Sequence, residues 1–188
     1  MSSSEAVLPN ARTVLGLDLA RNTGYSLITI CSEELDVSVG SFSVPKKEAD
    51  SGIQAGAITG KFLKSYIESL PEKKVDVLVY EGYGFSPGNA VFTIEFSSIV
   101  KYFLRDMAGT TILVAPTSLK KYVTGKGNIK KSMMPLEVYK RFGIEVDNDD
   151  ESDAVALAHF GVQWATDMKL VPKSHTPGLL PANVIHYS

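Results

Sequence analysis

Four carboxylates have sequence surroundings that suit metal-ion chemistry. Asp18 follows the apolar run VLGL and Glu81 follows VLVY, so each acid stands at the end of an expected buried strand. Asp150 and Asp153 are three residues apart at the start of the alanine-rich segment DESDAVALAHF, and this spacing puts both on one face of a helix. Each acid has a simpler interpretation as a turn cap, a lysine partner or a residue favoured by the helix dipole.

Bringing these four acids together would require cations. Two like charges about 4 Å apart repel by about 4 kcal/mol at an effective dielectric of about 20. Oxygen-rich sites select Mg²⁺ or Mn²⁺, whereas zinc prefers cysteine and histidine. The three histidines (His159, His175 and His186) are scattered along the chain, and Cys31 is its one cysteine. The sequence therefore predicts a site for Mg²⁺, with Mn²⁺ as a substitute.

A basic stretch lies beside an acidic one, although the formal net charge of the chain is only −2. Residues 117–141 carry seven bases and one acid, so their local charge is 7 − 1 = +6. Residues 145–153 carry six acids and no base. This pattern is typical of a protein that holds an anion such as a phosphate against bound cations, although two solvated faces would look the same.

The elements that must position these residues form one α/β domain with a mixed five-stranded sheet flanked by helices. Strands are expected over 13–20, 24–30, 35–44, 75–80 and 110–115, and helices over 52–70, 90–107, 116–122, 129–141 and 152–168. Three residues separate the first two strands, which predicts an antiparallel hairpin. We expect 1–12 to be a flexible N-terminal tail, 13–168 to be the domain, and 169–188 to be an irregular C-terminal tail.

Composition excludes several classes of protein. Hydrophobic residues make up 44% of the 188 positions and charged residues 21%, as in a soluble globular protein. We expect no membrane association, because the sequence has no apolar run of about 18 residues. A single cysteine and a polar N-terminal segment without signal-peptide order predict an intracellular, cytoplasmic protein.

Four segments, in order, resemble the motifs of the RuvC-like Holliday junction resolvases. GLDLARNTGYSLI is similar to their first strand and hairpin, VLVYEG to their second catalytic strand, and DESDAVALA to their last helix. PTSLKKYVTGKGNIKKS resembles their basic segment, in wording closest to bacteriophage members that act in a host cytoplasm. The match covers about residues 13–165. The resemblance implies an RNase H-like fold, a homodimer, and Mg²⁺-dependent paired nicking of four-way DNA junctions.

The same resemblance assigns roles to single residues. Asp18, Glu81, Asp150 and Asp153 match the four metal-binding carboxylates, although a slip by one residue would exchange Asp150 for Asp149.

Two further positions match basic residues that face the scissile strand, and an aromatic position differs. Lys120 and Lys131 occupy the two basic positions. The family can place an aromatic three residues after the glutamate, where this chain has Gly84, and Tyr83 and Phe85 on either side could serve instead.

These residues predict hydrolysis of a DNA phosphodiester with two metal ions and no nucleotide cofactor. Five lysines are expected to bind backbone phosphates: Lys120, Lys121, Lys126, Lys130 and Lys131. The apolar side of 90–107 (Val91, Ile94, Ile99 and Phe103) is the expected homodimer surface. The alternatives are an RNA-processing nuclease of the same superfamily and a non-catalytic branched-DNA-binding protein. A kinase-like ATPase, which shares a strand, an aspartate and a hairpin, normally needs a second domain.

Overall fold

The structure is a computed structural model that describes residues 12–31, 34–82, 90–166 and, for the backbone alone, 183–185. Its strands are β1 (Thr13–Asp18), β2 (Asn22–Cys31), β3 (Glu34–Ser43), β4 (Val75–Glu81), β5 (Ala108–Val114) and β6 (Asn183–Ile185). Its helices are α1 (Gly52–Glu68), α2 (Ala90–Leu104), α3 (Pro116–Thr124), α4 (Met134–Phe142) and α5 (Asp149–Ala165), with a 3₁₀ turn at Lys131–Met133. None of the helices in these ranges combines the length and apolar character needed to cross a membrane.

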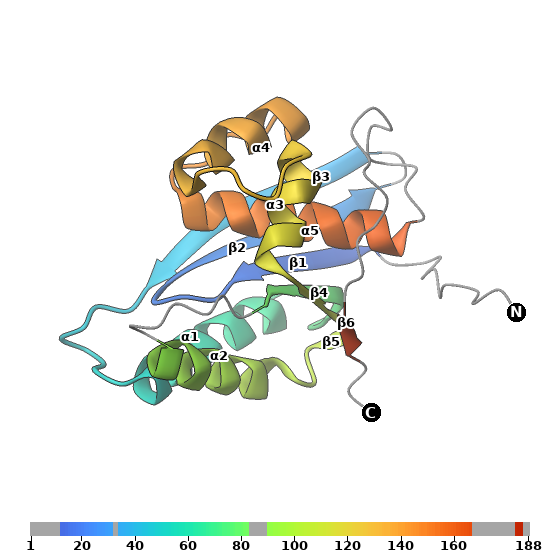
Figure 1. Cartoon of the computed structure of the whole chain (residues 1–188). Coiled ribbons are helices and arrows are strands. Elements are labelled where there is room, and N and C mark those ends of the chain that lie inside the picture. Colours follow the sequence, from blue (N-terminus) through green and yellow to red (C-terminus); the bar gives the residue numbers. More distant parts are fainter. Residues whose placement is uncertain (1–11, 32–33, 83–89, 167–182, 186–188) are drawn as a thin grey trace, which may run out of the picture.

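The strands form one mixed sheet in the order β3-β2-β1-β4-β5-β6. β1, β4 and β5 are parallel to one another, whereas β2, β3 and β6 are joined by antiparallel pairing. Helices α1 and α2 cover one face of the sheet, and α3, α4 and α5 cover the other (Figure 1). The predicted α/β fold and the hairpin between the first two strands are confirmed.

A sixth strand at the edge of the sheet differs from the expectation. Asn183–Ile185 pairs antiparallel with β5, although 169–188 was expected to be irregular throughout. Three residues are too few to show an alternating pattern, so this pairing depends on the open edge of β5 and not on a local sequence signal.

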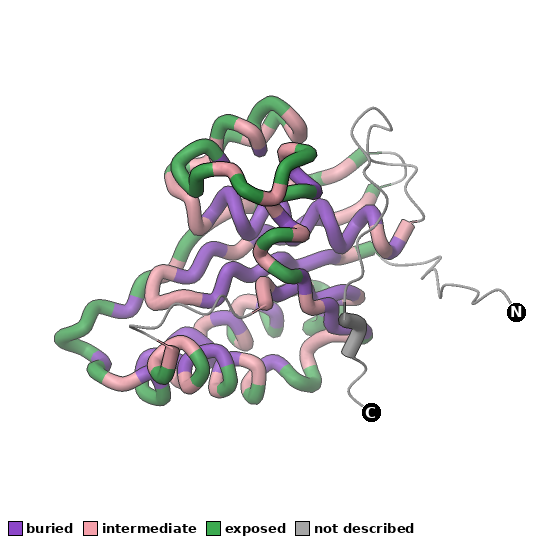
Figure 2. Tube along the Cα trace, in the orientation of Figure 1, coloured by how far each residue is buried: buried purple, intermediate pink, exposed green. Residues whose placement is uncertain are grey.

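The central strands are buried on both faces because successive side chains point to opposite sides. On β1, Val14 joins the core cluster beneath α5, whereas Leu15 and Leu17 join the cluster beneath α1 and α2. Figure 2 shows the resulting layers, with buried chain running through the central strands and along α5. The alternation fixes which side of the sheet each strand-end residue faces.

Helix α5 lies unusually close to the sheet because small residues meet at the contact. A Cβ on Gly16 of β1 would lie 2.4 Å from the backbone of Ala154 and Ala158, and a Cβ on Gly24 of β2 would lie 2.0 Å from the carbonyl oxygen of Asp150. Side chains at these glycines would push the helix away. The alanine-rich sequence of α5 therefore brings its first turn directly over the β1–β2 hairpin.

The expected dimer surface on α2 is only partly exposed. Ile99 and Phe103 pack towards α1, where Gly56 and Gly60 leave room for them. Val91, Ile94 and Tyr102 are exposed. Ile94 follows Val91 by three positions and Tyr102 follows Ile94 by eight, so all three lie on one side of the helix. Ile99 and Phe103 are therefore half-buried against α1, so a partner could reach only part of each side chain.

Two helix boundaries also differ from the expected ones. Residues 129–141 contain a 3₁₀ turn followed by α4 instead of one helix. Helix α5 begins at Asp149, three residues earlier than expected, because Asn148 caps it by accepting a hydrogen bond from the Glu151 N–H at 2.9 Å.

Candidate active site

Two of the predicted carboxylates end neighbouring parallel strands. Leu17 of β1 pairs with Tyr80 of β4, so the next positions on the two strands are Asp18 and Glu81. Alternation places both on the α5 side, because Leu17 and Tyr80 belong to the cluster beneath α1 and α2. Neighbouring strands lie about 4.8 Å apart, so the two acids share one short edge of the sheet.

The other two carboxylates come from the first turns of α5. Asp153 is buried, and Asp150 accepts a hydrogen bond from the side-chain amide of Asn22, the first residue of β2. Together with the contact at Gly24, this bond fixes the start of the helix against the hairpin that follows Asp18. The structure thus brings all four predicted acids to one end of the domain.

The pKa values of these acids show that they interact. Burial raises the pKa of Asp18 well above its usual value, and the charges of Glu81, Asp153 and Asp150 raise it further. Burial, followed by the charge of Asp153, raises the pKa of Glu81 to about 7. Burial is also the main reason why the pKa of Asp153 rises to about 6. A cation at this position would relieve the unfavourable charge of all three groups.

The ammonium group of Lys131 supplies positive charge at this site. Its Nζ lies 3.2 Å from Asp149 and 3.5 Å from Asp150. Burial opposes the charge on Lys131, but the nearby carboxylates, Asp18 foremost, outweigh it and raise its pKa. Lys120 of α3 also acts on the site, because its charge lowers the pKa of Glu81 and Asp153. Both lysines predicted to face the scissile strand therefore lie near the carboxylates.

The donor set suits a hard divalent cation, although its side chains are not closed around one. Within residues 12–31, 34–82 and 90–166, no three His, Cys, Asp or Glu side chains are close enough together to hold a metal ion. The predicted ligands are nevertheless all carboxylates, which Mg²⁺ and Mn²⁺ prefer. Burial and the repulsion between neighbouring carboxylates raise the pKa values of Asp18, Glu81 and Asp153. Residues of this kind fit a metal site, and Lys131 forms an ion pair with one of its predicted ligands, Asp150.

Glu151 ties the start of α5 to strand β3. Its Oε1 accepts a hydrogen bond from the Ser41 hydroxyl at 2.8 Å, and its Oε2 accepts one from the Asp147 N–H at 3.0 Å. The residue is buried, so these bonds satisfy a carboxylate that water cannot reach freely. Sequence reasoning missed both Glu151 and Asn22. The NTG run after Asp18 was a usable signal for Asn22, but its partner lies 128 positions away.

The remaining predicted residues lie farther from the carboxylates or outside the described residues. Lys121 is exposed on α3, and Lys126 and Lys130 are exposed along the segment that joins α3 to α4. Tyr83 and Phe85 fall outside the described residues. Asp150, whose side chain is 17% exposed and whose charge acts on Asp18, is more enclosed than Asp149, which is 44% exposed.

Comparisons with solved structures give the same fold. No protein-family model matches the chain, and no curated protein matches it in sequence. Thermus thermophilus RuvC superposes with a TM-score of 0.64 at 15% identity, over 85% of this chain and 98% of that one. The same protein with a Holliday junction substrate gives a TM-score of 0.67 at 14% identity with the same coverage. The yeast mitochondrial Holliday junction resolvase Ydc2 gives 0.53 at 17% identity, over 87% of this chain and 82% of its own. The chain therefore has the RNase H-like fold in the arrangement that these RuvC-type resolvases share.

Proposed function

We propose that this protein is a metal-dependent, structure-selective DNA endonuclease that resolves Holliday junctions and related branched DNA by paired nicking. The observation that carries the proposal is the meeting of Asp18 and Glu81 with Asp150 and Asp153, together with Lys120 and Lys131. The fold shared with RuvC, which has been solved with a Holliday junction substrate, supports the choice of substrate.

Each carboxylate has a distinct position in this proposal. Asp18, the most buried strand-end acid, and Glu81 would hold the metal ions from the ends of β1 and β4. Asp150 and Asp153 complete the site from α5. Two Mg²⁺ ions, when bound, supply an activated water and stabilise the leaving 3′ oxygen.

The lysines would hold the substrate. Lys120 and Lys131 stand among the carboxylates, where a scissile phosphate must lie if it is to meet them. Lys121, Lys126 and Lys130 extend positive charge along the surface of the α3–α4 segment. Such contacts act on the phosphate backbone and carry little base sequence information, which suits recognition by DNA shape.

A homodimer would supply the second nick. Two cuts on opposed strands of a two-fold symmetric junction need two equivalent sites, which a C2 dimer provides. The exposed side of α2, formed by Val91, Ile94 and Tyr102, supports a dimer contact because Val91 is 71% and Tyr102 61% exposed.

One gel assay tests the proposed function. The protein is incubated with a four-way DNA junction, a splayed DNA duplex and a structured RNA, each in Mg²⁺, Mn²⁺, Ca²⁺ or EDTA. We expect paired nicks in the four-way junction with Mg²⁺ or Mn²⁺, and binding with little cutting in Ca²⁺, because Ca²⁺ is larger and geometrically looser. Cutting in excess EDTA would rule out the metal-dependent mechanism. Cutting of RNA alone would favour an RNA-processing nuclease instead.

A further inference from the structure

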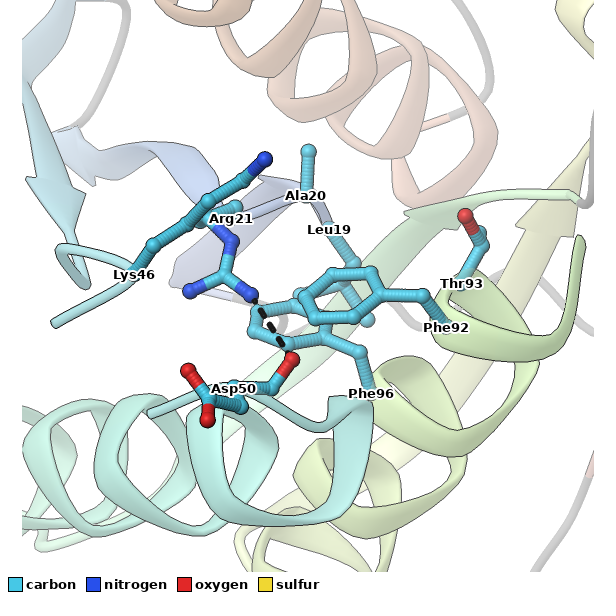
Figure 3. Close-up of a pocket in the computed structure, with 8 residues that line it drawn as sticks. All are labelled: Leu19, Ala20, Arg21, Lys46, Asp50, Phe92, Thr93 and Phe96. Atoms are coloured by element: carbon cyan, nitrogen blue, oxygen red, sulfur yellow. Dashed lines mark hydrogen bonds between the residues drawn. The ribbon is translucent and has the colours of Figure 1, made fainter. Parts of the chain in front are cut away.

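A pocket opens beside the candidate active site, on the other face of the sheet. It has a volume of about 530 Å³ and is lined by the turn that follows β1, by the loop between β3 and α1, and by the start of α2. Figure 3 shows Arg21 reaching into it between Lys46 and the Phe92 ring. None of its lining residues was part of the predicted site. We call it the Arg21 pocket.

The Arg21 side chain is held in place by its neighbours. Its Nη1 donates to the carbonyl oxygens of Val44 at 3.1 Å and Ala49 at 2.8 Å, and its Nη2 donates to the carbonyl oxygen of Asp50 at 3.4 Å. The guanidinium carbon lies 4.5 Å from the centroid of the Phe92 ring. Arg21 is thus a positioned cation and not a freely moving surface side chain.

One side of this guanidinium is available to a ligand. Among the described residues, no acceptor is found for the Nε–H of Arg21. Nη2 carries two N–H groups and donates one of them to Asp50, so its second N–H, on the same side as the Nε–H, is also available. These two parallel donors match the spacing of two phosphate oxygens. Lys46, which is exposed, lines the same pocket, so two cations face one acid, Asp50, and the local charge is 2 − 1 = +1.

The floor of the Arg21 pocket is apolar. Leu19 and Phe96 are buried there, and the Phe92 ring stacks near Phe96 with centroids 5.8 Å apart. A volume of about 530 Å³ far exceeds that of an isolated phosphate, whereas a positively charged rim above aromatic rings suits a nucleotide unit of a single strand.

The path of the chain connects this pocket to the carboxylates. Leu19, Ala20 and Arg21 follow Asp18 directly, and the side chains of Asp18 and Leu19 point to opposite faces of the sheet. A DNA strand whose scissile phosphate lies at Asp18 can therefore cross the sheet edge and continue into the Arg21 pocket.

We propose that the Arg21 pocket binds one nucleotide that flanks the scissile phosphate, with its phosphate held by Arg21 and Lys46 and its sugar or base against Phe92. This inference rests on the proposed function in that it takes the strand at the carboxylates to be DNA. It adds a phosphate contact on the face of the sheet opposite Lys120 and Lys131.

The experiment measures binding, so that it does not depend on cutting. Anisotropy titrations in Ca²⁺ use a four-way junction in which one linkage at a time around the branch point is a neutral methylphosphonate. For the wild-type protein, we expect a several-fold loss of affinity when the pocket phosphate is neutral. In Lys46→Ala the unmodified junction should bind several-fold more weakly, with a salt slope lower by about 0.9. In this variant, neutralising the pocket phosphate should cost less affinity than in the wild type, because the contact between Lys46 and that phosphate has already been lost.

Lys47→Ala is the matched control, because Lys47 is also exposed but does not line the pocket. Its profile of methylphosphonate penalties should follow that of the wild type. Arg21 is not substituted, because its hydrogen bonds also hold the loop before α1.

The outcomes separate this inference from the proposed function. If the wild type cuts junctions but the Lys46→Ala penalty profile is unchanged, the pocket does not hold a phosphate and the nuclease proposal stands. If Lys46→Ala removes the penalty at one linkage while the wild-type protein cuts no DNA, the pocket inference stands and the nuclease proposal fails. Failure to bind any DNA would overturn both.

Discussion

The side-chain amide of Asn22 donates a hydrogen bond to the carboxylate of Asp150, joining the first residue of β2 to the first turn of α5. Asn22 follows Asp18 by four residues, so the same hairpin carries one predicted metal ligand and orients another. Loss of a group that orients a metal ligand typically lowers metal affinity by about 10- to 100-fold.

Asn22→Ala should therefore weaken Mg²⁺ binding by about 10-fold, a typical effect for an outer residue of a metal site. Isothermal titration with Mn²⁺ measures the affinity, and melting without metal shows whether the fold is intact. Asn22→Asp serves as the counterpart: a further carboxylate beside Asp150 should lower the metal-free melting temperature and enlarge the Mg²⁺-induced rise. Unaltered Mn²⁺ affinity in Asn22→Ala would show that the hydrogen bond does not orient Asp150.

Asp18→Asn should lower the rate of nicking by orders of magnitude. The affinity for the junction in Ca²⁺ should stay close to that of the wild type. The amide keeps the shape of the side chain but removes the charge that a metal requires. At pH 8 the metal-free variant should also melt at a higher temperature, because a buried carboxylate among like charges has been replaced.

The control for Asp18→Asn is Asp149→Asn, since Asp149 is the more exposed of the two neighbouring acids on α5. It should nick DNA and respond to Mg²⁺ nearly as the wild type does. For an intact site, Mg²⁺ at about a hundred times its Kd adds about 2.7 kcal/mol of stability, and Asp18→Asn should lose most of this. Near-normal nicking by Asp18→Asn would overturn the proposed site.

Lys131→Met should destabilise the metal-free protein and increase the stabilisation by Mg²⁺. Lys131 is the cation nearest to Asp149 and Asp150 in the structure, so its removal leaves the carboxylates without that counter-charge. We expect the melting temperature to fall by about 2–4 °C, the shift that about 1 kcal/mol produces in a domain of this size. Lys121→Met is the control. Equal melting temperatures for the two variants, with and without Mg²⁺, would contradict this role.

Ile94→Arg should convert a dimer to monomers without unfolding the protein, because this side chain is 48% exposed on α2. Sedimentation velocity measures the mass of the free protein and of its complex with junction DNA. Leu136→Arg is the matched control, since Leu136 is 45% exposed on α4, across the sheet from α2. A wild-type protein that sediments as a monomer in both states would exclude the dimer.

His159 should make the fold sensitive to acid. Burial, and then the charge of Arg141, lower its pKa to about 4, and its ring stacks on Phe142 with centroids 4.0 Å apart. The unfolded chain binds a proton near pH 6.5 whereas the folded chain does not, so stability falls as the pH drops from about 6.5 to about 4. The loss over this range is on the order of a few kcal/mol, because one pKa unit corresponds to about 1.4 kcal/mol.

His159→Phe removes this proton and should flatten that part of the profile. Urea unfolding at pH 7 and pH 4.5 gives the comparison. The carboxylates near Asp18 titrate in both proteins, so the difference between their profiles reports on His159. Parallel profiles would show that His159 is protonated while folded.

The local signals in the sequence predicted five of the six strands described, and they singled out the four acids that the fold brings to one end of the domain. An apolar run that ends in an acid predicted Asp18 and Glu81, and alternation within those runs determines that both face α5. Contacts between distant segments could not be predicted, because no local pattern records them. Asn22 meets Asp150 only after the hairpin and α5 have packed together.

The degree of exposure of the apolar residues on α2 could not be predicted for a related reason. Helical periodicity groups apolar residues by their angle around the helix, but it does not say which neighbour covers them. Ile99 and Phe103 are half-buried because they pack against Gly56 and Gly60 of α1. The Arg21 pocket was not anticipated because its cations come from two loops and its rings from a helix.

The pairing of Asn183–Ile185 with β5 covers one edge of the sheet and so affects the tendency of the protein to aggregate. An uncovered strand at the border of a sheet is a template for strand addition by another molecule, and therefore a starting point for aggregation. The segment that protects β5 comes from the last residues of the sequence, far from the rest of the sheet along the chain. A truncation that removes residue 183 and everything after it would thus expose the backbone amides and carbonyls of β5.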